Sequence, residues 1–351
     1  MDDICCRLFA WYDMHKRDLP WRSTRNPYYI WISEVILQQT RVAQGYAYFV
    51  RFIALFPTVE TLADAPEDAV MRAWQGLGYY SRARNLHAAA KQIVKLGRFP
   101  DTYEDIRQLK GVGDYTAAAI ASFAFDEPKA AVDGNVCRVW SRMFGIDCPI
   151  DSVKGKRVIT EIAQELLPDS QAAKYNQAVM EFGALQCTPY SPSCVDCPLA
   201  DKCVALAEGK VDMLPSKSHK TKVIPRYLTY LYIHDAGSLL LHKRTGNDIW
   251  QNLYELPLIE TDVAIDADKL FLHPDFLAWK KIVPHYTYKG FTGGIKHVLS
   301  HRVLHATFHE LEVWGELSCP DGYVMVPFSE LSHYALPRLV ERYMQEKSGQ
   351  W

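Results

Sequence analysis

The stretch CTPYSPSCVDCPLADKC, residues 187–203, contains four cysteines separated by six, two and five residues. Three prolines and two serines interrupt it, so it predicts a loop wrapped around a bound group rather than a helix or strand. Sites with four thiolates hold either zinc or an iron–sulfur cluster. Structural zinc usually has two C-x2-C pairs, whereas this stretch has one such pair flanked by single cysteines. The spacing favours a [4Fe–4S] cluster over zinc, disulfides or free thiols. The expected ligands are Cys187, Cys194, Cys197 and Cys203.

Length and composition predict an ordered globular protein of two or three domains, with 351 residues, 48% hydrophobic and 23% charged. No apolar run reaches membrane-span length, and the first residues lack the order of a signal peptide. We therefore expect a cytoplasmic protein with no membrane partner. The nine cysteines are an odd number, which favours a reducing compartment. The net charge of −2 does not support nucleic-acid binding, so only local patches could provide it.

One carboxylate stands alone in an apolar helix. Asn26-Pro27 is a typical helix start, and the helix is expected to continue to Thr40. Glu34 is its only charged residue, with mostly apolar neighbours one turn away on each side. Burial would raise the pKa of Glu34 and let it hold a proton near neutrality. The alternative is a structural glutamate that caps the backbone or pairs with an arginine such as Arg41.

Two glycine-containing segments could contact DNA. The segment from Gly76 to Arg84 combines glycines, aromatic rings and two arginines, which suits a ring wedged into a base stack beside a phosphate. An ordinary helix junction with core tyrosines is the alternative. Further on, Lys110-Gly111-Val-Gly113 separates a short helix from a second one. Its backbone amides lie at a helix N-terminus, where they can hold one phosphate in a helix-hairpin-helix motif.

A second carboxylate follows this motif. Asp133 precedes a glycine at the start of a helix that ends near Gly145, and by default such a residue is an N-cap. Here, however, the order is a helix-hairpin-helix, an aspartate and a four-cysteine loop. Chance rarely supplies this three-part order.

This order resembles the helix-hairpin-helix GPD superfamily of DNA glycosylases, and four segments are similar to the MutY adenine DNA glycosylases. They are Leu19-Pro-Trp-Arg22, Ser33-Glu34-Val-Ile-Leu-Gln-Gln-Thr40, Gly76-Leu-Gly-Tyr-Tyr-Ser-Arg82 and Val132-Asp-Gly-Asn-Val136. The resemblance covers about residues 7–215. It implies an all-α glycosylase fold, with a six-helix domain over residues 25–128. Residues 1–24 and 129–212 would form an iron–sulfur cluster domain, and DNA would lie between the two.

The resemblance also implies roles for single residues. Glu34 would be the acid that protonates adenine N7, and Asp133 would stay ionised to stabilise an oxocarbenium-like sugar. Asn135 and Tyr115 would position these two carboxylates. The adenine would first be rotated out of the duplex. The residues expected to contact DNA are Gln39, Thr40, Tyr79, Arg82, Lys110, Gly111 and Gly113.

The C-terminal part reads as a separate α+β module. Residues 213–225 have the composition of a linker, and strand-like segments and a closing helix follow within residues 226–351. MutY proteins carry a NUDIX-like domain at this position. The G-x5-E-x7-R-E-x2-E-E hydrolase pattern is absent around Gly246 to Glu260, so we expect no pyrophosphatase activity.

Histidines at positions 297, 301, 305 and 309 recur every fourth residue. On one strand they would share a face but extend over about 40 Å, too far for one metal ion. Ser300 and His301 correspond to a Phe-Ser-His of MutY proteins that contacts the 8-oxoguanine opposite the target adenine. Leu299 replaces the phenylalanine here.

The resemblance predicts base excision repair by a monofunctional, monomeric glycosylase that removes adenine opposite 8-oxoguanine or guanine in double-stranded DNA. One alternative is a bifunctional glycosylase and lyase like endonuclease III, whose nucleophilic lysine lies two residues after the second hairpin glycine. Tyr115 occupies that position here. Two further alternatives are an iron–sulfur electron-transfer protein and a DNA-binding module without chemistry.

Overall fold

The computed structural model describes residues 3–218, 223–314 and 319–348. The chain packs into two compact units, which are described separately. The first comprises Met1–Asp64 and Asn85–His219 and is called the helical unit. The second comprises Ala65–Arg84 and Lys220–Trp351 and is called the sheet unit. The domain boundaries expected from the sequence remain a prediction, and residues 219–222 of the expected linker lie outside the described part.

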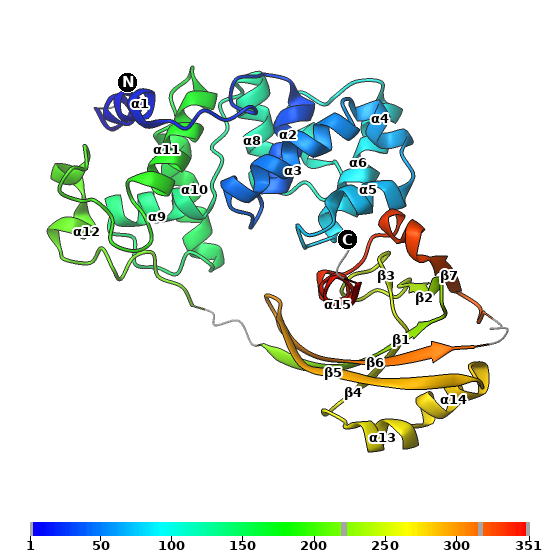
Figure 1. The fold of residues 1–351 in the computed structure, drawn as a ribbon. Helices are drawn as coiled ribbons and strands as arrows, with labels where there is room; N and C mark the ends of the chain where they lie inside the picture. The colour runs from blue at the N-terminus through cyan, green and yellow to red at the C-terminus, as the bar shows by residue number, and fades with distance from the viewer. Residues whose placement is uncertain (1–2, 219–222, 315–318, 349–351) are drawn as a thin grey trace. The chain divides into compact units, whose positions relative to one another are not determined.

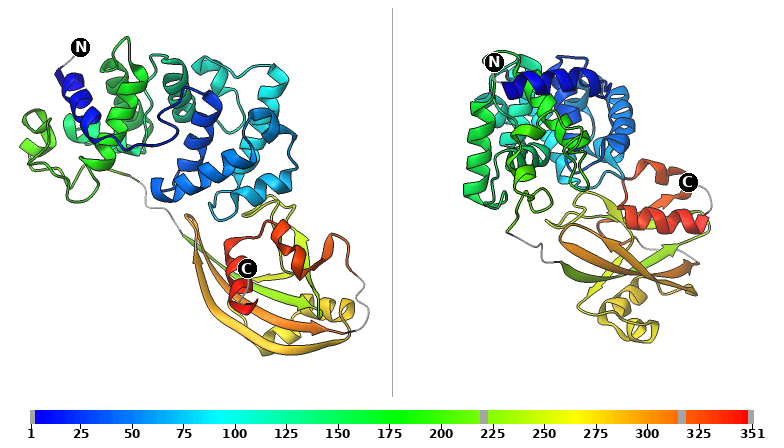
Figure 2. Two further views of the ribbon diagram at one scale, coloured as in Figure 1. Left: turned by 45° about the horizontal axis from the view of Figure 1, so that its top comes forward. Right: turned by 90° about the vertical axis from the view of Figure 1, so that its left-hand side faces the viewer.

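One group of helices in the helical unit joins the N-terminus to a later part of the chain. It comprises α1 (Asp3–His15), α9 (Gly134–Met143), α10 (Val153–Glu165) and α11 (Ala172–Leu185). Helix α1 lies against α11, as Figures 1 and 2 show. Large fully buried side chains fill their common core, including Trp140, Tyr175 and Phe182. Burial of this apolar surface is what stabilises the group.

Besides α2 (Pro27–Leu37), five helices of this unit lie between α1 and α9 along the chain. They are α3 (Val42–Leu55), α4 (Val59–Asp64), the part of α6 (Ser81–Leu96) from Asn85 onward, α7 (Tyr103–Arg107) and α8 (Asp114–Phe125). Asn26 caps α2 as expected, since its side chain accepts a hydrogen bond from Tyr28 N–H at 3.0 Å. Both α3 and α8 pack on α2. Within the described residues, no helix is both long enough and apolar enough to cross a membrane.

The sheet unit contains a mixed seven-stranded sheet in the order β3-β2-β1-β6-β5, with β4 paired to β1 and β7 to β2. The strands are β1 (Ile224–His234), β2 (Ser238–Lys243), β3 (Tyr254–Glu255), β4 (Leu258–Thr261), β5 (Tyr286–Val298), β6 (Arg302–Val313) and β7 (Tyr323–Pro327). Strands β1 and β6 are parallel, whereas the other pairs are antiparallel.

Helices cover both faces of this sheet (Figure 1). Helix α15 (Arg338–Ser348) packs on one face, and α13 (Ala267–Leu272) and α14 (Pro274–Ile282) pack on the other. The 3₁₀ helix η2 (Phe328–His333) adds Leu331 to the core on the α15 side. Helix α5 (Glu67–Trp74) also belongs to this unit, although it lies far away in the sequence.

The four histidines at positions 297, 301, 305 and 309 do not lie on one strand. His297 lies on β5, His305 and His309 lie on β6, and His301 lies in the turn between them. The chain reverses here because Leu299 N–H donates to the carbonyl of Arg302 at 2.8 Å, which closes a tight hairpin. The fourfold spacing therefore reflects no common face.

Candidate active site and cysteine loop

Glu34 lies on α2 and is only 8% exposed. Tyr115 OH donates a hydrogen bond of 2.7 Å to Glu34 Oε2. Burial raises the pKa of Glu34 to about 7, although the hydrogen bond from Tyr115 opposes the rise and the charge of Asp133 adds to it. No ion pair between Glu34 and Arg41 occurs among the described residues. The carboxyl group can therefore hold a proton near neutral pH.

Asp133 is the N-cap of α9, as its position at a helix start predicted. Its Oδ1 accepts from Val136 N–H at 2.8 Å, and its Oδ2 accepts from Asn135 Nδ2 at 2.8 Å. Burial raises the pKa of Asp133, while these hydrogen bonds and the charge of Arg138 favour the ionised form. Its surroundings differ from those of Glu34, which accepts from a tyrosine.

Both carboxylates line one cavity of the helical unit. Seven residues expected at the site from the sequence line it together: Glu34, Gln39, Thr40, Gly113, Tyr115, Asp133 and Asn135. Gln39 has a φ of 60°, in the left-handed region that non-glycine residues rarely adopt. Such conformations persist where the surrounding structure holds them, often at functional sites. Lys110 and Gly111 do not line this cavity.

The expected hairpin joins α7 to α8. Gly111 has a φ of 77°, and a Cβ on it would lie 2.5 Å from Cβ of Asn85, so only glycine fits this turn. Lys110 N–H already donates to Gln92 Oε1 at 2.7 Å. Gly113 is the N-cap of α8, and a Cβ on it would meet no atom within 4 Å. The N-terminus of α8 is thus open to an anion.

Sequence reasoning missed a charged cluster on the same cavity. Glu181 of α11 is 1% exposed and accepts hydrogen bonds of 2.6–2.9 Å from both Arg17 and Arg22. Burial alone would raise the pKa of Glu181, but these two arginines lower it to about 2. Arg22 belongs to the Leu19–Arg22 segment, yet its partner lies far away in the sequence and has no local signal.

Two arginines one turn apart on α9 were also missed. Arg138 Nη2 donates to Asn135 Oδ1 at 2.8 Å, and Arg138 Nε donates to the carbonyl of Cys187 at 2.8 Å. Arg142 Nη1 donates to Cys187 Sγ at 3.3 Å and to the carbonyl of Thr188 at 2.7 Å. Both side chains are buried. Two arginines at i and i+4 on a mostly apolar helix face were the available signal.

The four cysteines gather at the end of the helical unit, after α11 and around η1 (Ala200–Lys202) and α12 (Val204–Ala207). Burial raises the pKa of Cys197 to about 11, and the charges of Cys187, Cys203 and Cys194 contribute to the rise. The thiols therefore lie near one another, although no group of described residues converges well enough to hold a single metal ion.

The four cysteine thiols have the chemistry that a [4Fe–4S] cluster requires. In a [4Fe–4S] cluster each thiolate binds a different iron, so the sulfurs need not converge on one point. The buried guanidinium of Arg142 beside Cys187 Sγ would stabilise a thiolate. Three of the four cysteines also pack against the apolar core of their helix group. The residues present fit a cluster.

The predicted wedge loop lies in the sheet unit. Tyr79 is 44% exposed and has a φ of 48°, whereas Tyr80 is 5% exposed and accepts a hydrogen bond from Gly76 N–H. One tyrosine is thus a core residue, and the other projects outward. The guanidinium of Arg82 lies over the Tyr79 ring at 5.2 Å. Tyr79 OH forms a hydrogen bond with Ser300 Oγ in the turn between β5 and β6.

Two parts of the chain match known protein families. Residues 32–178 match the HhH-GPD superfamily of base excision DNA repair proteins, and residues 229–346 match the NUDIX domain. A thermostable thymine-DNA glycosylase is similar in structure, with a TM-score of 0.54 and 28% identity, over 58% of this chain and 95% of that one. The helical fold is therefore that of a base excision repair glycosylase, followed by a NUDIX-type sheet domain, and the expected fold class is confirmed.

Within the base excision repair glycosylases, the chain is similar in sequence to adenine DNA glycosylases. An adenine DNA glycosylase of Buchnera aphidicola subsp. Baizongia pistaciae is 35% identical over 71% of this chain and 72% of its own length. The human adenine DNA glycosylase is 43% identical over 56% of this chain and 38% of its own. This chain belongs to the adenine DNA glycosylase family.

Proposed function

We propose that this protein hydrolyses the N-glycosidic bond of adenine opposite 8-oxoguanine or guanine in duplex DNA. The observation that carries the proposal is the pair of carboxylates in one cavity, held by different partners. Family membership supports the activity on adenine. Relatives of known structure include endonuclease III bound to DNA, which supports DNA as the partner through a shared fold.

In the proposed reaction, Glu34 donates its proton to adenine N7, which makes the base a better leaving group. The C1′–N9 bond breaks and leaves positive charge on the sugar. Asp133, whose ionised form is favoured by the hydrogen bonds from Val136 N–H and Asn135, stabilises that charge and helps to deliver water to C1′. Tyr115 orients the acid through its hydrogen bond to Glu34.

The four cysteines would hold a [4Fe–4S] cluster, with Arg142 beside Cys187. When bound, the cluster would cross-link the loop and supply a structural role rather than a step of the reaction. Arg138 joins the cysteine loop to Asn135, so order in this loop supports the position of Asn135.

In the sheet unit, Ser300 and His301 are proposed to recognise the opposite base, with Tyr79 as a wedge. 8-Oxoguanine differs from guanine by an O8 acceptor and an N7–H donor, which a hydroxyl and a nearby amide can match. Arg82 and the Lys110–Gly113 turn are proposed to contact phosphates. DNA as the substrate also supports a nucleoid-associated location.

The proposal is tested by single-turnover adenine release from duplexes with A opposite 8-oxoguanine. Glu34→Gln and Asp133→Asn should each abolish release and retain DNA binding. Glu165 lines the same cavity but is exposed, so Glu165→Gln is the matched control and should keep the wild-type rate. Retained turnover in either of the first two variants would remove that residue from the site. Strand scission without alkali, or stoichiometric borohydride trapping, would instead favour a bifunctional lyase.

A further inference from the structure

Helix α5 and the loop after it belong to the glycosylase part of the chain by sequence but pack with the sheet unit. Residues 65–84 lie inside the stretch that matches the glycosylase superfamily, residues 32–178. By packing, however, Ala65–Arg84 form one compact unit with the C-terminal residues from Lys220 onward. Specific contacts must therefore hold this segment against the sheet.

A set of polar contacts does so, and we call it the α5 clamp. Lys243 Nζ lies 2.5 Å from Asp68 Oδ1, and Tyr254 OH lies 3.4 Å from Asp68 Oδ2. Glu67 accepts from the side-chain amide of Asn252. The clamp is completed by Arg84 Nη1, which donates to the carbonyl of Gln251 at 2.8 Å, and by Leu336 N–H, which donates to Gln75 Oε1 at 3.2 Å.

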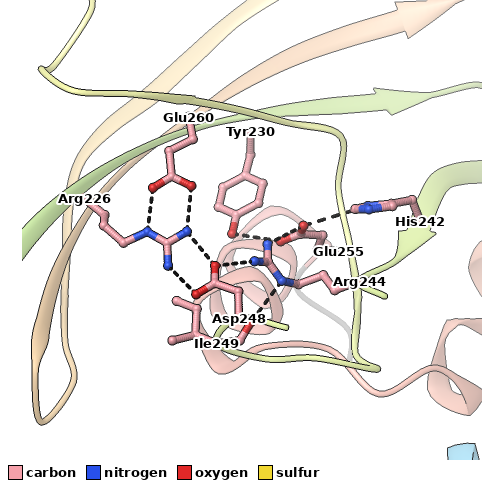
Figure 3. A network of polar contacts seen from close by, with 8 residues as sticks. All are labelled: Arg226, Tyr230, His242, Arg244, Asp248, Ile249, Glu255 and Glu260. Carbon is pink, nitrogen blue, oxygen red and sulfur yellow. Dashed lines mark hydrogen bonds and ion pairs between the residues drawn. The ribbon is translucent and has the colours of Figure 1, made fainter. Parts of the chain in front are cut away.

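The loop that presents Gln251 and Asn252 is fixed by its own network (Figure 3). Asp248 accepts from Arg226 at 2.7–2.9 Å and from Arg244 at 3.0 Å. Arg226 and Arg244 are only 13% and 12% exposed, so these pairs are well shielded from solvent.

The same network extends to β3 and to the loop backbone. Arg244 also donates to Glu255, which is 1% exposed, and to the carbonyl of Ile249 at 3.0 Å. Trp250 and Asn252 have φ values of 61° and 67°. A bulky residue in the left-handed region is strained, so the network must hold it there.

On the other side of the clamp, the loop after α5 is also fixed. Trp74 Nε1 donates to the carbonyl of Gly78 at 3.1 Å, and the Arg82 guanidinium lies 5.5 Å from the Trp74 ring centroid. Tyr79 then projects from this loop and contacts Ser300. The loop after α5 thus meets the turn between β5 and β6 at Tyr79 and Ser300, while the clamp ties the same loop to residues 251 and 252 of the sheet unit.

We propose that the Asp68–Lys243 and Glu67–Asn252 pairs of the α5 clamp are positioning residues that set how well the protein distinguishes 8-oxoguanine from guanine opposite adenine. They do so by holding Tyr79 against Ser300. This inference rests on the proposed function, because it assigns base discrimination to that contact. None of the four residues touches the proposed reacting groups.

The first test needs neither DNA nor activity. Hydrogen exchange in the full chain should show the amides of residues 65–84 and 245–254 exchanging two- to fivefold faster in Asp68→Asn, because partly exposed ion pairs contribute modestly. Asp68→Lys adds like-charge repulsion with Lys243, so these amides should exchange roughly tenfold faster than in the wild-type protein. The double variant Asp68→Lys with Lys243→Asp should restore protection. Unchanged exchange in Asp68→Lys would overturn the clamp.

The second test measures the ratio of single-turnover rates for A opposite 8-oxoguanine and A opposite guanine. Asp68→Lys should lower this ratio by about three- to tenfold, and the charge swap should restore it. Lys289 and Glu312 form a pair of similar exposure, 2.6 Å apart, between β5 and β6. Swapping their charges should leave the ratio unchanged.

The outcomes of the two tests are separable. Altered exchange with an unaltered ratio would overturn the positioning role while leaving the docking contacts in place. Failure of the wild-type protein to release adenine from either duplex would contradict the proposed function, whereas the exchange test would still decide whether the clamp exists.

Discussion

At the scale of single residues, the protonation of Glu34 is the most informative property. Its ordinary pKa is 4.5, and burial raises it to about 7. If the protonated form donates to adenine, activity requires pH below this value. The single-turnover rate of adenine release should therefore fall about tenfold per pH unit above about pH 7, and it should also fall at low pH, where Asp133 becomes protonated. A rate that rises above about pH 7 would contradict the role of Glu34 as an acid.

Tyr115 provides a control for this assignment. Its hydrogen bond lowers the pKa of Glu34, so Tyr115→Phe should move the falling limb of the pH profile to higher pH. A purely structural Tyr115 would change the rate at every pH by the same factor. The measurement is the pH–rate profile of both proteins at one salt concentration.

At the scale of elements, Glu181 ties α11 to the segment before α2. Removing one member of a buried charge cluster strands the others, so Glu181→Gln should lower the free energy of unfolding by about 3 kcal/mol at pH 7. Because the folded pKa of Glu181 is about 2, below its ordinary value of 4.5, its stabilising contribution is present above pH 4.5 and is lost as pH falls toward 2.

Denaturant unfolding at pH 7 and pH 3 measures both effects. Glu161 pairs with Arg157 at 3.5 Å but is 65% exposed, so Glu161→Gln should change stability by less than about 1 kcal/mol. An equally small effect for Glu181→Gln would show that its arginines find other partners.

The cysteine loop is the second element with a direct test. Iron analysis of anaerobically purified protein should give about four iron atoms per chain. Cys197→Ser should lower the iron content and impair folding or DNA binding rather than the chemical step. Cys6 is exposed and lies outside the loop, so Cys6→Ser should keep the wild-type iron content. Stoichiometric zinc would contradict the cluster.

At the scale of the whole molecule, we predict that lesion recognition depends on the sheet unit. Ser300 lies in the turn between β5 and β6, where its hydroxyl meets Tyr79. Ser300→Ala should reduce the preference for 8-oxoguanine over guanine by roughly tenfold, as expected for one lost hydrogen bond to a buried partner. The measurement is the single-turnover rate and affinity for both duplexes at one salt concentration.

Deletion of residues 222–351 should cost more of this preference than Ser300→Ala, while activity on A opposite G survives better. The deletion also removes the partners of Asp68 and Arg84, so part of its effect would come from the loop that carries Tyr79. A truncated protein that discriminates as well as the full chain would place lesion recognition in the remaining residues.

Much of this protein could be predicted from short stretches of sequence. The glycines at 111 and 113 and the isolated charge of Glu34 each report a local requirement, a turn or a buried acid, and the spacing of the cysteines predicts a ligand set. The fold class and the family followed from their order along the chain. Such patterns are readable because each depends on residues within a few turns of one another.

Only the tertiary structure decided the rest. It brought Glu34 and Asp133 to one cavity, gave Glu181 its two arginines, divided four evenly spaced histidines between two strands and the turn joining them, and placed residues 65–84 with the sheet unit. The physical reason is common to all four. Each pairing joins residues that are distant in the chain or separated by a turn, and packing of apolar surfaces selects such pairs without leaving a periodic pattern in either partner.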